Sequence, residues 1–180
     1  MKKILLTIVA VLGFATLGNA QSIFHKGTSM VNVGIGFGTE SNSSIVIPPL
    51  SASYEFGIVD NMFSTGQGSL GLGFYTGYAK YKYDLGYIPE FAKSRIEYSS
   101  FVVAPQLSLH YQFVPKLDTY ASLLMGYRLY SYNSGYKGDD GEFAWGIHVG
   151  GRYMFSPNVG AFVELGYGVS NVSAGAAFRF

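Results

Sequence analysis

The sequence predicts an all-β fold, a transmembrane antiparallel up-and-down β-barrel of about eight strands. Apolar residues alternate with polar or small ones in eight successive segments, most of them near the roughly 10 residues that a tilted strand needs to cross a bilayer. The links between these segments alternate in length. Aromatic residues gather toward the segment ends, as they do at the two interfaces of a membrane.

The first 20 residues have the order of a secretory signal peptide. Lys2 and Lys3 precede an apolar run from Ile4 to Leu17, and small residues follow it up to Ala20. The run is shorter than the roughly 20 residues that a membrane-spanning helix needs. We therefore expect cleavage after Ala20 and a single barrel domain over residues 21–180.

The composition separates the chain from soluble proteins and from helical membrane proteins. Charged residues make up only 13% of it and hydrophobic residues 48%, whereas about a quarter of a soluble domain is charged. No segment after residue 20 has a comparable unbroken apolar run. The chain has no cysteine, which excludes disulfides and a lipoprotein anchor of the usual kind. Loss of Lys2 and Lys3 turns the formal charge of +1 into −1, so nothing indicates a nucleic-acid partner.

The first segment, residues 31–38, shows the alternation clearly. Val33, Ile35 and Phe37 share one face, while Asn32 and three glycines share the other. The same pattern continues in segments 50–58, 69–78, 101–113, 121–129, 143–155, 159–169 and 171–180. Glycines favour the polar face, as expected if that face lines the crowded interior of a small barrel. A soluble lipocalin-like barrel is the alternative, but it would not need exposed rings at both rims.

The links predict which end of the barrel faces which side. Three links are short and would be periplasmic, namely 60–67, 114–118 and 156–158. Three longer links would be external, namely 40–49, 82–97 and 131–142, together with a tight fourth link at Ser170. Both termini would then be periplasmic. The aromatic residues would form an outer girdle of Tyr78, Tyr127 and Trp145 and an inner one of Phe56, Phe113, Phe155 and Phe178.

Charged and amide side chains fall on the polar face and would meet in the lumen. They are Glu55, Gln106, His110, Gln112, Arg128, His148, Arg152, Glu164 and Arg179. Buried charges must be paired, so we expect a structural network that plugs the barrel, with Glu55 and Glu164 as partners of the arginines. A conducting or binding site is the alternative.

The sequence offers little support for catalysis or for a metal. His110 and His148 could form a metal or proton-relay site, but no cysteine, third nearby histidine or acidic cluster accompanies them. We therefore favour the interpretation that the two histidines fill the lumen and make hydrogen bonds there. We expect no cofactor. The external links contain no histidine, which weakens a loop-borne hydrolase or acyltransferase site. A tyrosine, lysine or carboxylate site in link 82–97 stays open.

The mature chain resembles the small eight-stranded outer-membrane barrels of the OmpA and OmpX type. The last strand carries the most specific part of this resemblance, apolar alternation at Ala174 and Ala176 that ends on Phe178 and the C-terminal Phe180. The resemblance implies that Phe178 and Phe180 form a signal for the barrel-assembly machinery. It also implies a location in the bacterial outer membrane, in contact with its lipid and lipopolysaccharide.

The leading functional hypothesis is a non-enzymatic, monomeric barrel with a plugged polar lumen and a structural or surface-interaction role in the envelope. Links 82–97 and 131–142 are rich in tyrosine and mixed charge and could contact a surface ligand. The alternatives are a narrow channel for a small or apolar solute and a lipid-modifying envelope enzyme.

Overall fold

The structure is a computed structural model that describes residues 22–38, 44–63, 66–84, 95–132 and 141–180. The predicted signal peptide, residues 1–20, lies outside the described residues, as do the centres of links 40–49, 82–97 and 131–142. In the described part of the chain, no helix is both long enough and apolar enough to cross a membrane.

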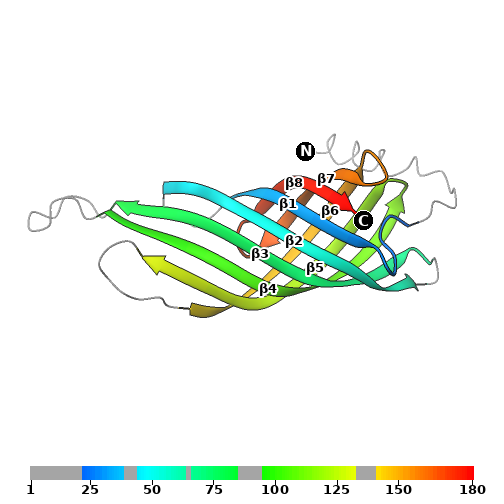
Figure 1. Ribbon diagram of the computed structural model, residues 1–180, viewed down its shortest axis with the longest axis horizontal. Helices are drawn as coiled ribbons and strands as arrows, with labels where there is room; N and C mark the ends of the chain where they lie inside the picture. The colour runs from blue at the N-terminus through cyan, green and yellow to red at the C-terminus, as the bar shows by residue number, and fades with distance from the viewer. Residues whose placement is uncertain (1–21, 39–43, 64–65, 85–94, 133–140) are drawn as a thin grey trace, which may run out of the picture.

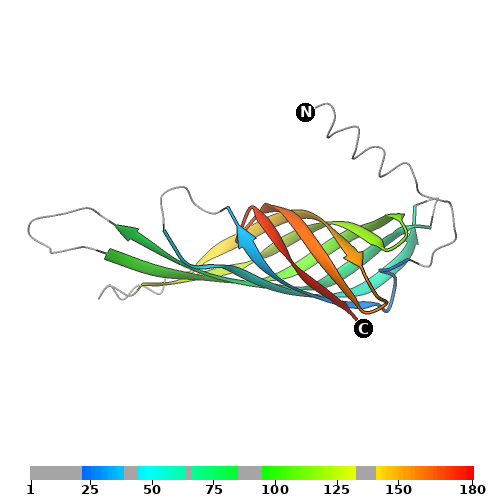
Figure 2. The same cartoon turned by 90° about the horizontal axis from the view of Figure 1, so that it is seen from above.

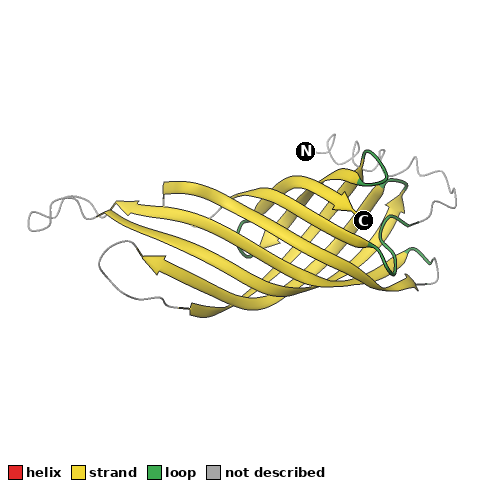
Figure 3. Cartoon of the chain, viewed as in Figure 1, coloured by secondary structure: helices red, strands yellow, loops and turns green. Residues whose placement is uncertain are grey.

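Eight antiparallel strands close into one barrel, which confirms the predicted fold class (Figure 1). The strands are β1 (Ser29–Phe37), β2 (Ser44–Met62), β3 (Gly68–Asp84), β4 (Arg95–Val114), β5 (Leu117–Tyr132), β6 (Gly141–Met154), β7 (Val159–Tyr167) and β8 (Val172–Arg179). Each strand pairs with its neighbours in sequence, and β8 returns to pair with β1, where Val33 lies opposite Ala176. Strands and short loops make up the described fold (Figure 3).

Each strand has one buried and one exposed face, as the alternation predicts. In β4 the buried residues are Val102, Ala104, Gln106, Ser108 and His110, and the exposed ones are Phe101, Val103, Leu107 and Leu109. The polar and small residues therefore line the lumen, and a continuous belt of large apolar side chains covers the outside. An apolar belt of this extent requires a lipid environment.

Glycine allows neighbouring strands to approach closely inside the barrel. A Cβ atom on Gly126 of β5 would collide with the backbone of Val103 and Ala104 on β4. The outward-facing Gly151 has room, because the nearest atom to such a Cβ, Cδ1 of Leu117, would lie 3.6 Å away. The prediction that glycines lie where the lumen is crowded therefore holds at Gly126.

The two ends of the barrel differ. At one end, called the turn end, the links 63–67, 115–116 and 155–158 are short, and the start of β1 and the C-terminus lie there too (Figure 1). At the other, called the extended end, β3, β4 and β5 project well beyond β7 and β8 (Figures 1 and 2). Link 168–171 lies at this extended end, and so do the strand ends that border the undescribed residues 39–43, 85–94 and 133–140.

The structure corrects several predicted link boundaries. β2 begins at Ser44, so Pro48 and Pro49 belong to a strand and not to link 40–49; register shifts between Ile45 and Leu50 accommodate them. Link 82–97 is likewise shorter, because β3 runs to residue 84 and β4 begins at residue 95. Link 114–118 reduces to two residues, 115 and 116, and β5 begins immediately after them.

The projecting part of β3 and β4 carries an ion pair. Nζ of Lys80 lies 2.8 Å from Oε2 of Glu97 on the adjacent strand. The hydrogen bond to Glu97, together with its negative charge, raises the pKa of Lys80. Both side chains are partly exposed, so this pair contributes little to stability.

Candidate functional site

All nine predicted lumen residues lie on the inner face of the barrel. Seven are buried: Glu55, Gln106, His110, Gln112, His148, Arg152 and Glu164. Arg128 and Arg179 are partly exposed, since they lie near the extended end and the turn end respectively. The nine residues are distributed along the barrel axis, from the turn end to the extended end.

The central group is built around Arg152, whose side chain is 0% exposed. Its Nη2 donates to Oε2 of Glu55, and its Nη1 donates to Oδ2 of Asp118 at 3.1 Å. Glu55 belongs to β2 and Arg152 to β6, which are opposite walls of an eight-stranded ring. The guanidinium also lies 4.1 Å from the ring centroid of Tyr120, within cation–π range.

His110 and Gln106, both on β4, complete this charged cluster. Nδ1 of His110 lies 3.0 Å from Oδ2 of Asp118 and donates to it, because a carboxylate can only accept. Nε2 of the same ring lies 3.5 Å from Oε1 of Glu55. Nε2 of Gln106 donates to Oε1 of Glu55 at 2.9 Å. Glu55, Asp118, Arg152, His110 and Gln106 are referred to below as the charged cluster.

The segment before β1 enters the lumen from the turn end. The ring of Phe24 is buried and stacks on His110, with centroids 3.8 Å apart. The carbonyl of Phe24 accepts a hydrogen bond from Oγ of Ser69 at 2.9 Å, and the Ile23 amide donates to Oε1 of Gln112 at 2.6 Å. Residues 22–28 thus cover the turn-end side of the charged cluster.

A second polar group lies on the other side of the cluster. The hydroxyl of Tyr120 donates to Oε1 of Glu164 at 2.6 Å, and Nδ1 of His148 lies 3.9 Å from Oε2 of the same carboxylate. The prediction that Glu164 pairs with an arginine is wrong. The tyrosine hydroxyl satisfies Glu164 because Arg152 is already held by Glu55 and Asp118.

The two remaining arginines occupy the ends. Nη2 of Arg179 lies 3.1 Å from Nε2 of His25 at the turn end. Arg128 donates from Nη2 to the carbonyl of Gly168 at 3.1 Å and from Nη1 to the hydroxyl of Tyr130 at 3.3 Å. Nη1 of Arg128 also lies 3.5 Å from Oε1 of Glu142.

Arg128 lines a cavity at the extended end, called the vestibule. Its volume is about 260 Å³, and its walls include Tyr81, Tyr98, Tyr130, Ser100 and Ser170. The rings of Tyr81 and Tyr98 lie 5.2 Å apart, and those of Tyr98 and Tyr130 lie 6.3 Å apart. The projection of β3, β4 and β5 supplies these three rings.

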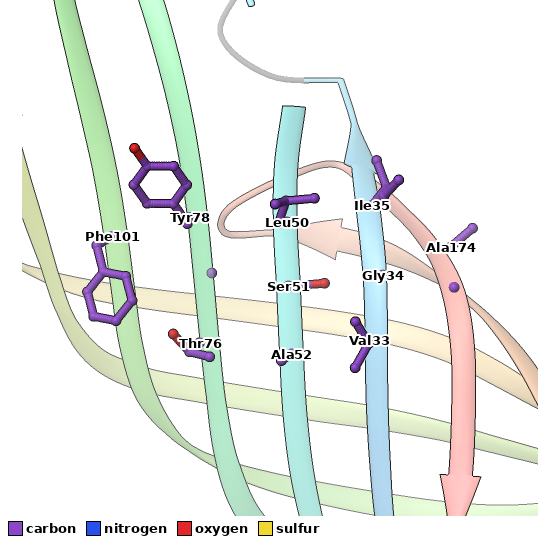
Figure 4. Close-up of a pocket in the computed structure, with 12 residues that line it drawn as sticks. Val33, Gly34, Ile35, Leu50, Ser51, Ala52, Thr76, Tyr78, Phe101 and Ala174 are labelled. Carbon is purple, nitrogen blue, oxygen red and sulfur yellow. The ribbon is translucent and has the colours of Figure 1, made fainter. Parts of the chain in front are cut away.

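The outer surface has a separate feature, a lateral groove of about 530 Å³ across β1, β2 and β3. The middle of the groove carries the short side chains of Ala52 and Thr76 (Figure 4). Larger side chains border it, with Tyr78 and Phe101 on one side and Val33 and Ile35 on the other (Figure 4). The lining is almost wholly apolar, which suits a hydrocarbon chain.

The lumen offers little for catalysis. The contact between His110 and Asp118 is similar to that between the base and the orienting acid of a hydrolase triad, but both side chains are almost fully buried, so no substrate could reach them. His110 and His148 belong to different groups and do not form one site. Across the described ranges, no set of three or more His, Cys, Asp and Glu side chains is arranged to hold a metal ion.

Sequence reasoning missed four lumen residues. Asp118 was assigned to a link, although it continues the inward alternation with Tyr120 and Ser122. Tyr75, whose ring centroid lies 5.5 Å from that of His148, and Tyr120 are buried on the polar face, but their large rings did not mark them as members of a polar network. Phe24 lies outside the strand pattern, and no signal in the sequence places its ring in the lumen.

No protein-family model matches the sequence, and no curated protein sequence matches it either. Solved structures resemble its fold. The outer membrane protein OprG of Pseudomonas aeruginosa is 9% identical over 89% of this chain and 99% of its own, with a TM-score of 0.54. The N-terminal β-barrel domain of OprF from the same organism is 16% identical over 87% and 98%, with a TM-score of 0.52.

Ail, the attachment invasion locus protein of Yersinia pestis, is also similar. In its complex with the heparin analogue sucrose octasulfate it is 12% identical over 86% of this chain and 99% of its own, with a TM-score of 0.52. Together with the closed ring of eight strands, these likenesses define the class. The chain has the fold of the small eight-stranded outer-membrane β-barrels of the OmpA and OmpX type.

Proposed function

We propose that this protein resides in the bacterial outer membrane as a monomeric, non-enzymatic barrel with a closed lumen, and that it serves envelope integrity or surface contacts. The apolar outer belt supports residence in a membrane. The turn end, with the C-terminus, would face the periplasm, and the projecting strands would face the medium.

The observation that carries a closed lumen is the bridge made by Arg152 between opposite walls. Its guanidinium is bound to Glu55 on one side and to Asp118 on another, and Phe24 covers the cluster from the turn end. An eight-stranded barrel has an interior just wide enough for side chains. A continuous water path would have to displace this buried, hydrogen-bonded cluster, which costs several kcal/mol.

Partners follow from the surfaces of the barrel. At hydrocarbon depth only acyl chains are available to fill the lateral groove, so we assign it to a chain of the surrounding outer-membrane lipid or lipopolysaccharide. The exposed Phe180 and its neighbour Phe178 would be read by the barrel-assembly machinery. Links 82–97 and 131–142 would carry any surface ligand. Ail, a protein of similar fold, has been crystallised in complex with a heparin analogue.

The test is a conductance measurement on the refolded chain. Residues 21–180 are folded in detergent, a heat-shifted gel band verifies the barrel, and current is recorded in a planar bilayer. We expect no steady current from the folded wild type. Replacing Glu55, Asp118 and Arg152 together with alanine should open a measurable conductance, while Glu142→Gln, which removes a carboxylate at the rim, should not.

A steady current from the folded wild type would contradict the closed lumen and indicate a narrow channel instead. Mass spectrometry of lipid A from cells with and without the protein tests the non-enzymatic assignment. A change in acyl chains or head groups that depends on the protein would overturn it.

A further inference from the structure

We propose that the vestibule at the extended end binds a small carboxylate-bearing solute, about one sugar or benzene ring in size, through Arg128. This binding is independent of the proposed closed lumen, since the vestibule lies on the other side of the charged cluster from Phe24.

The vestibule is positively charged. Among the described residues that line it, Arg128 is the one with a charged side chain. The acid that pairs with its guanidinium among the described residues, Glu142, is 54% exposed at the rim and lies at an N–O distance of 3.5 Å. An anion inside the cavity would therefore meet a cation whose described counter-charge is a half-exposed carboxylate at the rim.

Arg128 is held in place and still has donors to offer. The carbonyl of Gly168 and the hydroxyl of Tyr130 accept two of its five N–H groups. Its Nε also lacks a hydrogen-bond partner within the described structure, but that atom is buried, so the donors left for a ligand are the second N–H groups of Nη1 and Nη2. A planar guanidinium that is fixed in this way suits a carboxylate, which can accept two parallel hydrogen bonds.

The size and depth of the vestibule limit the ligand. About 260 Å³ is slightly below the range of roughly 300–1,000 Å³ that holds drug-sized ligands. Tyr81, Tyr98 and Tyr130 make part of the lining aromatic, which fits a compact ring. The pocket on the inner side of Arg128, lined by Tyr75 and Leu124, has a volume of only about 10 Å³, which holds no more than one water molecule. A solute would therefore enter and leave by the same mouth.

Glu142 competes with the ligand. Its Oε1 accepts a hydrogen bond from the Tyr130 hydroxyl at 2.7 Å and faces Nη1 of Arg128. An incoming carboxylate would take over both interactions and release Glu142 to solvent. Removing the Glu142 charge should accordingly strengthen binding, whereas removing the Arg128 charge should abolish the preference for an acid.

The experiment is a calorimetric or NMR titration of the folded chain in detergent with two matched pairs of probes. Glucuronate is compared with glucose, and benzoate with benzyl alcohol, so that the pair that responds identifies the kind of ring. We expect one acid to bind at least tenfold more tightly than its neutral partner. Glu142→Gln should tighten this binding severalfold, and Arg128→Gln should weaken it at least tenfold.

Two further variants make the result specific. Arg128→Lys keeps the charge but loses the planar pair of donors, and we expect binding between that of the wild type and that of Arg128→Gln. Lys80→Gln removes a nearby cation that does not line the vestibule and should leave binding unchanged. The heat-shifted band verifies that each variant is folded. Failure of both acids to bind the wild type, or equal binding to Arg128→Gln, would overturn the proposal.

Discussion

Replacing Arg152 with methionine should destabilise the barrel severely. Methionine keeps much of the side-chain length but leaves the carboxylates of Glu55 and Asp118 buried without their shared cation. Removing one partner of a buried ion pair costs about 3–5 kcal/mol. The change also removes the guanidinium from the ring of Tyr120, 4.1 Å away. Since folded proteins are stable by about 5–15 kcal/mol, the expected loss is a large part of the total.

The free energy of unfolding can be measured by urea titration of the barrel in lipid vesicles. Trp145 is the single tryptophan of the chain and faces outward, so its fluorescence reports transfer between lipid and water. The control combines Arg152→Met with Glu55→Gln and Asp118→Asn, which removes the charges together. Neutral replacement of a whole buried ion-pair group is often tolerated, so this variant should recover most of the loss.

A loss of less than about 1 kcal/mol for Arg152→Met alone would refute the reasoning, because exposed ion pairs are of that size. Water would then hydrate Glu55 and Asp118, and the lumen would have to be wet at the level of the cluster. A triple variant no more stable than the single one would show that shape, and not charge, sets the cost.

Three further predictions concern packing and assembly. Phe24→Ala removes the ring stacked on His110 and should cost about 3 kcal/mol in the same urea titration; an unchanged midpoint would place residues 22–28 outside the lumen. Gly126→Ala should reduce the yield of heat-shifted barrel sharply, because the added methyl group meets the backbone of β4, whereas Gly151→Ala should fold normally. Phe180→Ala should leave the free energy of unfolding of the refolded protein within about 1 kcal/mol of wild type, since the ring is 76% exposed. The same change should lower the amount of barrel assembled in cells. Equal amounts of the two proteins by immunoblot would contradict the proposed role of this residue as an assembly signal.

The sequence was sufficient for the strands and their faces because a lipid-facing barrel repeats one simple rule along the whole chain. Strand pairing follows chain order, so no long-range choice had to be made except the closure of β1 on β8. The same rule placed Glu55 and Arg152 on the inner face. Their pairing was predicted correctly for Glu55, whose β2 position lies across the lumen from β6.

The contacts that fill the lumen could not be predicted because they depend on depth along the axis, and alternation specifies only the face. Glu164 is on the predicted face, yet its carboxylate accepts a hydrogen bond from Tyr120 and not from an arginine. Asp118 was assigned to a link and not to a strand because the Pro–Lys turn before it, with Lys116 at a φ of 66°, is tighter than the composition suggested. Phe24 belongs to no strand, so its stacking on His110 is a purely tertiary contact.

The closure of the ring by β1 and β8 has a consequence for the order in which the barrel forms and opens. All other strand pairs join consecutive segments and can form as hairpins, at a low cost in loop entropy. The closing pair, and the contact between His25 and Arg179 across 154 positions, must wait until the whole chain is in place. A barrel that forms its seam last is expected to lose it first. Damage elsewhere in the barrel would then appear as parting of β1 from β8, which leaves two unpaired strand edges exposed in the membrane while the remaining hairpins stay joined.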